Sequence, residues 1–275
     1  MDKVKGLIYG FAIGDALGVP FEFKARDSFV AEGMTGYGTY NQPKGTWSDD
    51  TSLLLATCAS LKEYNKVNLL DLRRRFEQWL FKGEYTVDGH VFGVGVATSQ
   101  ALKTRKGQDD FYSNGNGSLM RILPLAFVAC SESDIAAVSS ITHGHSISIR
   151  ACQTLICIIR ELLNGRKLRE ILLSIDVDKE LGRLCELENL SRDDIKSTGY
   201  VVDTLEAALW CVLHTTNYKE AVLLAVNLGD DTDTVAAITG GLSGLIYGYD
   251  NIPTDWLELL RNKELIERCL FESKV

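Results

Sequence analysis

Two short acidic clusters carry the residue types in this chain that could do chemistry. Residues 46–51 read TWSDDT and residues 229–234 read GDDTDT, and each cluster directly precedes an apolar, helix-forming segment. Ser, Thr and Asp are favoured at helix N-caps, and acids in a first turn complement the helix dipole, so capping explains part of each cluster. Adjacent carboxylates repel one another, however, and a buried group of them needs a cation. A metal site is therefore the second interpretation.

The donor atoms of the two clusters indicate which cation they suit. They offer carboxylate and hydroxyl oxygens without Cys or His, which favours Mg²⁺, Mn²⁺ or Ca²⁺ over zinc. A calcium-binding EF-hand does not fit. Counting from Asp231 places Ala236 at position 6 and Leu242 at position 12, where that loop has Gly and Glu.

Two further segments of small or basic residues precede helices. Residues 113–121 read SNGNGSLMR, and small residues before a helix start expose backbone N–H groups that can hold an anion; a plain loop has the same composition. Residues 142–146 read THGHS. Two His two residues apart cannot share a helix face, which disfavours a shared metal. One of them could contact a ligand, and capping or surface placement is equally open.

Helices must position these segments, because apolar residues recur at helical spacing along most of the chain. Proline occurs only four times, and no long linker divides the sequence. We predict an all-α fold in a single domain over residues 1–275, with 175–200 as a charged surface excursion. The predicted helices cover 3–17, 50–64, 68–81, 94–103, 119–130, 133–140, 146–164, 166–174, 201–214, 218–227, 233–248 and 261–271.

Glycine recurs every fourth residue in the first and the penultimate predicted helix. The two series are Gly6, Gly10, Gly14, Gly18 and Gly240, Gly244, Gly248. Each series makes a narrow stripe without side chains, and the cost of glycine in a helix, about 1 kcal/mol each, is usually offset by close helix packing. We expect these two helices to pack together at the centre of the fold. Asp15 would then lie near the segment that precedes residue 240.

The composition excludes several classes of protein. With 45% hydrophobic and 24% charged residues over 275 positions, the chain is an ordinary globular sequence, and its net charge of −8 makes nucleic acid an unfavourable partner. The seven cysteines form no C-x-x-C pair, which indicates reduced core residues in a cytoplasmic protein. We expect no signal peptide, because Asp15 interrupts the first apolar run, and no membrane span.

The order of these motifs resembles the ADP-ribosylglycohydrolase family. The matching strings are GFAIGDALGVPFE at 10–22, WSDDT at 47–51, GNGSLMR at 115–121, TH at 142–143 and GDDTDT at 229–234. The string GYVVDTLEAALW at 199–210 also resembles the corresponding sequence in the bacterial branch of the family that acts on dinitrogen reductase. The resemblance covers essentially the whole chain, and five short motifs in the right order are specific together.

The resemblance implies an all-α orthogonal bundle around two divalent cations, Mg²⁺ or Mn²⁺, and hydrolysis of ADP-ribose from a modified protein side chain. By position, one set of metal ligands is Ser48, Asp49 and Asp50, and the other is Asp231, Asp233 and Thr234. The positions that meet the diphosphate and ribose are Ser113, Asn114, Gly115, Asn116 and Gly117. His143 falls where a histidine meets the ligand.

A mechanism follows from this resemblance. Cleavage at the anomeric carbon develops oxocarbenium-like charge, which flanking carboxylates stabilise while metals orient a water molecule. By position, Glu22 is the candidate base for that water, and a surface acid at a helix end is the other interpretation of this residue.

One departure from the family pattern leaves the function open at this point. Arginine-type bacterial members have F-D-I-G, whereas this chain has FGVG, so Gly93 stands where their acid would be. The enzyme could use Glu22 alone, prefer a linkage other than arginine, or bind ADP-ribose and cleave it slowly. The alternatives to a hydrolase of this class are therefore an ADP-ribose-binding regulatory module and a hydrolase of another glycosidic nucleotide.

Overall fold

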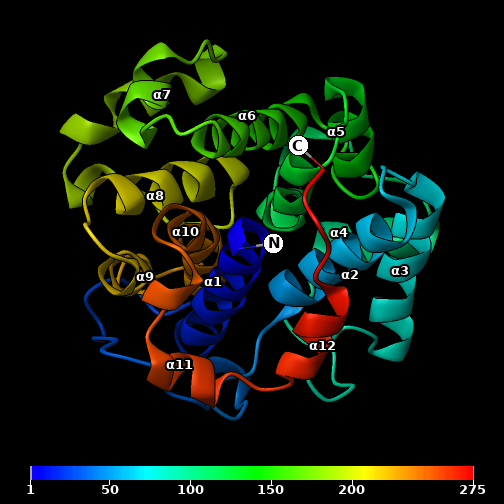
Figure 1. Ribbon diagram of the computed structural model, residues 1–275, viewed down its shortest axis with the longest axis horizontal. Helices are drawn as coiled ribbons and strands as arrows, with labels where there is room; N and C mark the ends of the chain where they lie inside the picture. The colour runs from blue at the N-terminus through cyan, green and yellow to red at the C-terminus, as the bar shows by residue number, and fades with distance from the viewer. Residues whose placement is uncertain (1, 275) are drawn as a thin grey trace.

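Two helices from opposite ends of the chain, α1 (Asp2–Gly18) and α10 (Thr232–Tyr247), lie side by side at the centre of the computed structural model, which describes residues 2–274 (Figure 1). Their contact is the most extensive between any two elements. A Cβ atom on Gly10 would lie 2.3 Å from the carbonyl oxygen of Gly240, and one on Gly6 would lie 2.4 Å from that of Gly244. The predicted packing of the two helices is confirmed, although Gly248 lies just beyond α10 with no atom within 4 Å of an added Cβ.

The other helices surround this pair. Figure 1 shows α2, α3 and α4 on one side of α1 and α8 and α9 on the other, with α5, α6 and α7 along a third edge. Their bounds are α2 (Asp49–Tyr64), α3 (Leu69–Lys82), α4 (Val96–Thr104), α5 (Glu132–Ser139), α6 (Ser146–Leu163), α7 (Leu168–Ser174), α8 (Val201–Leu213), α9 (Tyr218–Val226), α11 (Thr254–Leu259) and α12 (Lys263–Cys269).

Short 3₁₀ helices complete the chain between these elements. They are η1 (Val19–Phe21), η2 (Gly38–Tyr40), η3 (Phe111–Ser113), η4 (Asn116–Arg121), η5 (Leu123–Phe127), η6 (Lys179–Asn189), η7 (Arg192–Asp194) and η8 (Tyr249–Asn251). Within residues 2–274 there is no β-strand, only three isolated bridges. The predicted all-α fold class is confirmed.

The structure differs from the predicted elements in three segments. The predicted α-helix over 119–130 is wrong: this segment forms η4 and η5, because Pro124 has no N–H to donate and its ring does not fit an α-helix interior. Segment 175–200 is not merely a surface excursion, since η6 buries three leucines at a spacing of three, which matches the 3₁₀ period. Helix α11 was not predicted; it lies beyond Pro253, in a stretch too short for a clear apolar period.

The structure qualifies two expectations that came from composition, one about the cysteines and one about the first apolar run. All seven cysteines are free, but Cys157 and Cys185 are exposed, so only part of the set are core residues. Helix α1 with η1 is long and apolar enough to cross a membrane by composition, yet 89% of that stretch is buried inside the fold. Its apolar character therefore belongs to the core contact with α10.

Substituting alanine for Gly14 should weaken the central contact. The new Cβ would lie 2.0 Å from the carbonyl oxygen of Ala236, so the two helices must separate. Overpacking of this kind costs on the order of 1–3 kcal/mol, more than the ~1 kcal/mol that alanine gains as a helix former. We expect Gly14→Ala to lower the midpoint of urea unfolding. Gly182→Ala, where no atom lies within 4 Å of the added Cβ, is the control and should leave the midpoint unchanged or raise it slightly.

Candidate functional site

A cavity of about 570 Å³ opens where α2 and α10 begin, beside α4 and η4. It collects the acidic clusters, the glycine-rich loop and the histidine from four separate parts of the sequence. Ten of the thirteen predicted site residues line it: Glu22, Asp49, Asp50, Gly115, Asn116, Gly117, His143, Asp231, Asp233 and Thr234.

The first acidic cluster is held at the start of α2 by Asp15 of α1. Asp15 is fully buried and accepts hydrogen bonds from the backbone N–H of Ser48 (2.9 Å), and from the N–H (2.9 Å) and hydroxyl (2.6 Å) of Thr51. Ser48 caps the helix by accepting from the Asp50 N–H, and its hydroxyl donates to Asp50 Oδ2 at 3.1 Å. Capping thus explains Ser48, whereas Asp49 and Asp50 face the cavity.

The second cluster lies at the start of α10 and meets the first. Asp231 occupies the N-cap position, but its side chain makes no capping hydrogen bond. Its Oδ2 instead accepts from the Asn116 amide at 2.8 Å. The Thr234 hydroxyl donates to Asp50 Oδ2 at 3.3 Å and so joins the two clusters. The Asp231 carboxylate therefore does not cap α10, and the capping interpretation is wrong for this residue.

Glu22 lies beside the second cluster. Carboxylate oxygens of Glu22, Asp231 and Asp233 all lie within 4.8 Å of one another. The backbone fixes this arrangement, because Phe23 N–H donates to the Asp230 carbonyl at 2.7 Å and Asp230 N–H donates to the Lys24 carbonyl at 2.9 Å. Glu22 is 8% exposed, so its interpretation as a surface acid is wrong.

The electrostatics of this centre favour a cation. Burial first, and then repulsion between neighbouring carboxylates, raises the pKa of Asp49, Asp50 and Asp233 well above the usual range. Three buried oxygens have no hydrogen-bond partner among the described residues: Glu22 Oε2, Asp50 Oδ1 and Asp231 Oδ1. Leaving such atoms unpaired costs free energy, and carboxylate oxygens are the ligands that Mg²⁺ and Mn²⁺ prefer. The donor set therefore fits hard divalent cations.

The glycine-rich loop forms the opposite wall of the cavity. Asn116 N–H donates to the Gly199 carbonyl at 3.0 Å, which fixes the loop against the start of α8. A Cβ on Gly117 would lie 2.8 Å from His143 Cε1 and 2.9 Å from the Thr98 hydroxyl, so glycine is required here. This wall lets a ligand approach the backbone closely.

His143 faces this loop as a neutral imidazole. Burial, together with the nearby Arg121 guanidinium, lowers the pKa of His143 to about 3. Its Nδ1 lies 2.7 Å from the Thr142 hydroxyl, and its Nε2 lies on the Gly115 side of the ring. The second histidine of the THGHS segment, His145, caps α6 instead.

Three predicted residues lie outside the cavity lining. Ser48 packs beneath Asp50, as described above. The Ser113 hydroxyl donates to Asp110 Oδ2 at 2.6 Å, and Asn114 accepts from the Ser148 hydroxyl at 2.8 Å.

Other residues reach the cavity without having been predicted as site residues. Gly199 begins the GYVVD string, and that string could have identified it as a site residue. Tyr40, Thr98 and Phe23 line the cavity but lie outside the acidic and glycine-rich strings. Asp15 lies in the first motif, yet only the structure shows that it holds the start of α2.

The family model for ADP-ribosylglycohydrolases matches residues 1–273. The chain belongs to the ADP-ribosylglycohydrolase family. An ADP-ribosylarginine hydrolase of Serratia proteamaculans is 36% identical over 97% of this chain and 77% of the relative. The ADP-ribosyl-[dinitrogen reductase] glycohydrolase of Rhodospirillum rubrum is 30% identical over 95% and 91% of the two chains.

A solved structure described as an ADP-ribosylglycohydrolase-related protein complex superposes with a TM-score of 0.82 at 30% identity and covers 98% of this chain and 95% of that chain. The predicted family and enzyme class, a hydrolase that releases ADP-ribose, are confirmed by these comparisons.

Gly93 of this ADP-ribosylglycohydrolase has a structural reason to lack a side chain. Its φ of +74° is unfavourable for other residues, and an added Cβ would lie 2.5 Å from Asp49 Oδ1. A side chain at this position would therefore strain the backbone and require the Asp49 carboxylate to move. The loop around Gly93 contributes backbone, not a carboxylate, to the cavity.

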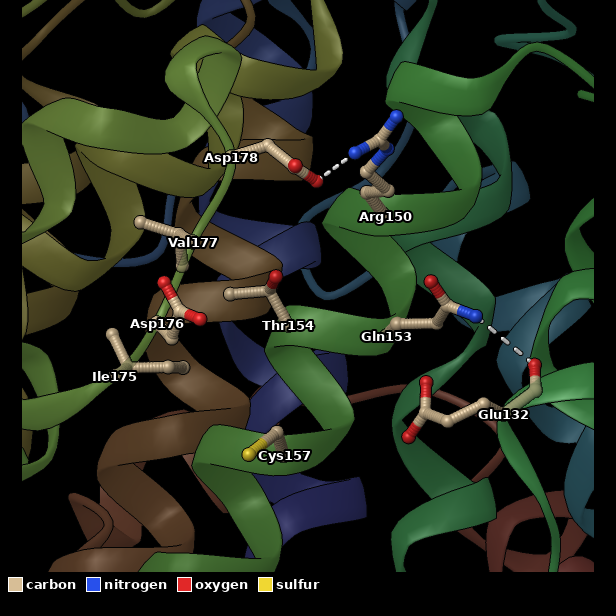
Figure 2. Close-up of a pocket in the computed structure, with 9 residues that line it drawn as sticks. All are labelled: Glu132, Arg150, Gln153, Thr154, Cys157, Ile175, Asp176, Val177 and Asp178. Atoms are coloured by element: carbon tan, nitrogen blue, oxygen red, sulfur yellow. Dashed lines mark hydrogen bonds and ion pairs between the residues drawn. The ribbon is translucent and has the colours of Figure 1, made fainter.

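A second cavity, of about 280 Å³, lies between α6 and residues 175–178 (Figure 2). Arg150, the cation among its lining residues, forms an ion pair with Asp178. Figure 2 shows the Cys157 side chain there. None of the predicted site residues lines this cavity, so the central one is the candidate site.

Ionisation of Glu22 should destabilise the protein when divalent metal is absent. Burial, followed by repulsion from Asp231, raises its folded-state pKa from 4.5 to about 7, so the folded state holds this proton to higher pH than the unfolded state does. The cost is absent well below pH 4.5 and grows as the pH rises to about 7. In urea unfolding with EDTA, we expect Glu22→Gln to become progressively more stable than the wild type over this range.

The difference between the two proteins is the quantity to measure, because titration of groups that do not interact with Glu22 cancels in it, and the relief of Asp49 and Asp233 from its repulsion changes it in the same direction. A difference that stays constant with pH, or that favours the wild type as the pH rises, would contradict the assigned environment of Glu22.

Proposed function

We propose that this protein uses two divalent cations, Mg²⁺ or Mn²⁺, to hydrolyse the bond between ADP-ribose and a modified arginine side chain of a protein. The observation that carries the proposal is a single cavity in which buried, unpartnered carboxylate oxygens face a wall of glycines. The arginine linkage is supported by relatives 36% and 35% identical to this chain, both called ADP-ribosylarginine hydrolases.

The metals would be held between the two acidic clusters. The first cluster would contribute Asp49 and Asp50, with the predicted ligand Ser48 behind them and hydrogen-bonded to Asp50, and the second would contribute Asp231, Asp233 and Thr234. Divalent cations bound there would supply Lewis-acid stabilisation of the ribose hydroxyls and of a water molecule. The side chains already lie close together, so they need little rearrangement to form such a site.

The opposite wall would bind the diphosphate. Glycines at 115 and 117 leave the backbone bare, and a bare backbone wall before a helical turn suits phosphate oxygens. His143, held neutral by burial, presents Nε2 on this side without adding charge. The ligand would therefore lie with its diphosphate at the loop and its modified ribose carbon at the acids.

Glu22 would handle the proton of the attacking water. Water oxygen bonds to the anomeric carbon as the bond from that carbon to the arginine nitrogen breaks. The water proton passes to the Glu22 carboxylate and is then returned to the departing nitrogen, which leaves Glu22 ionised again. The surrounding carboxylates stabilise the positive charge that develops at the ribose.

The remaining expectations extend this proposal. We place the protein in the cytoplasm on the strength of its seven free cysteines.

An ADP-ribose-binding module with weak turnover is the alternative that Gly93 motivates, and the complete set of candidate metal ligands supports the hydrolase instead.

Release of free ADP-ribose tests the proposal directly. Purified protein is given one arginine-linked and one serine-linked ADP-ribosylated substrate, each with Mg²⁺, with Mn²⁺ and with EDTA. We expect release from the arginine-linked substrate with either metal and none with EDTA. Binding of ADP-ribose without release from either substrate would favour the binding module, and release from the serine-linked substrate alone would overturn the linkage.

Asp231→Asn separates the metal site from the fold. The amide keeps an oxygen that can accept from Asn116 but removes the charge, so we expect kcat/KM to fall roughly 100-fold or more, the scale of several kcal/mol of electrostatic stabilisation. Asp230→Asn is the matched control, because Asp230 is exposed, lies outside the cavity lining and has a positive φ that Asn tolerates. Equal activity of the two variants would show that the metal ligands are misassigned.

A further inference from the structure

Arg121 is a buried cation that the proposed mechanism does not use. It ends both η4 and the string GNGSLMR, yet its side chain is fully buried and lies outside the cavity lining. Among the described residues its guanidinium hydrogen-bonds only to neutral oxygens: the carbonyls of Gly117 (2.8 Å) and Val138 (3.1 Å) and the hydroxyl of Thr142. A buried charge without a carboxylate partner costs free energy, so its place behind the glycine-rich loop requires a reason.

Two of the hydrogen bonds from Arg121 end on the same oxygen. Its Nη1 and Nη2 donate to Thr142 Oγ1 at 3.1 and 3.0 Å. A hydroxyl has two lone pairs, so both acceptor positions of Thr142 are occupied and its own proton remains to be donated. The remaining hydrogen-bond partner of Thr142 Oγ1 within residues 2–274 is Nδ1 of His143, at 2.7 Å. Because a guanidinium cannot accept, Thr142 must donate and Nδ1 must accept.

The ring proton of His143 therefore lies on Nε2. A neutral imidazole has one ring proton, and a ring whose Nδ1 accepts carries that proton on the other nitrogen. The ring lines the central cavity, and a Cβ added to Gly115 would lie 3.6 Å from Nε2. The backbone holds it there, because His143 N–H donates to the Ser139 carbonyl and the Ser139 hydroxyl donates to the His143 carbonyl, both at 2.9 Å.

We infer that Arg121 and Thr142 are positioning residues that fix the ring proton of His143 on Nε2, where it is donated to a phosphate oxygen of the ligand. The inference rests on the proposed function. A phosphate oxygen only accepts, so the other tautomer would place a lone pair against it. A neutral group in place of Arg121 could accept as well as donate, whereas the guanidinium allows one direction only. The buried charge thereby selects the tautomer before the ligand binds.

Nitrogen NMR of the histidine rings tests the tautomer independently of activity. The chain has four histidines, and the signals lost in His143→Gln identify those of His143. With ¹⁵N-labelled histidine, the spectrum shows which ring nitrogen carries the directly bonded proton. We expect the wild type with Mg²⁺ and no ligand to carry it on Nε2 of His143. A proton on Nδ1, or a mixture of the two tautomers, would overturn the inference.

Thr142→Val removes the hydroxyl and keeps the shape of the side chain. We expect His143 to lose its single tautomer and the Kd for ADP-ribose, measured by calorimetry with Mg²⁺, to rise roughly tenfold, the scale of one hydrogen bond. Thr142→Ser keeps the hydroxyl and should restore both the Nε2 proton and the wild-type Kd.

Thr57→Val is the matched control for this loss. Thr57 is equally buried, and its hydroxyl donates to the Leu53 carbonyl of its own helix at 3.0 Å. It should keep the wild-type Kd. Equal Kd values in Thr142→Val and Thr57→Val, or a Thr142→Ser that binds as weakly as Thr142→Val, would overturn the inference.

Arg121→Lys separates the direction of the hydrogen bonds from the charge. The ammonium keeps the cation, but its single nitrogen does not fill both lone pairs of Thr142, so we expect both tautomers of His143 and a raised Kd. A single Nε2 proton with the wild-type Kd would overturn the role of Arg121. A wild type with the proton on Nε2 that does not bind ADP-ribose would overturn the proposed function, whereas one that binds ADP-ribose with the proton on Nδ1 would overturn this inference alone.

Discussion

The contact between α1 and α10 brings the backbone of one helix against the carbonyl oxygens of the other, and the positions of the acids follow from it. At its cavity end, a Cβ on Gly18 would lie 2.4 Å from the Asp233 Cα, and the Thr232 hydroxyl donates to the Gly18 carbonyl at 2.8 Å. Asp15, one turn earlier, holds the start of α2. Glu22, one turn later, lies beside Asp231 and Asp233. One helix therefore places both acidic clusters and the candidate base.

This arrangement works against the stability of the fold. Six acids meet in a buried space, and the raised pKa values of Asp49, Asp50 and Asp233 show the cost of ionising them together. Side chains cannot satisfy all of their oxygens, as the partnerless atoms of Glu22, Asp50 and Asp231 show. A site that binds cations and positive transition-state charge must carry this uncompensated charge, and the tightly packed core of α1 and α10 supplies the rigidity that holds it.

Much of this could be predicted from sequence, and the failures have physical causes. Glycine spacing predicted the central contact because only small residues allow such close approach. The acidic clusters were found because repelling carboxylates in a row are rarely structural. Tyr40 was missed as a residue that lines the cavity, since its place there depends on how the loop folds back through Gly38, which no local pattern encodes. Ser113 and Asn114 belong to the right loop, but hydrogen bonds to Asp110 and Ser148 turn their side chains away from the cavity.

The central claim is that the α1–α10 contact assembles one cation-binding centre from two distant acidic clusters. Anomalous diffraction from crystals grown with Mn²⁺ tests it most directly, because it locates the metal independently of activity. We expect anomalous peaks inside the central cavity, between Asp49 and Asp50 on one side and Asp231 and Asp233 on the other. Well-diffracting crystals at saturating Mn²⁺ with no peak in that cavity, or with peaks bound only elsewhere, would contradict it.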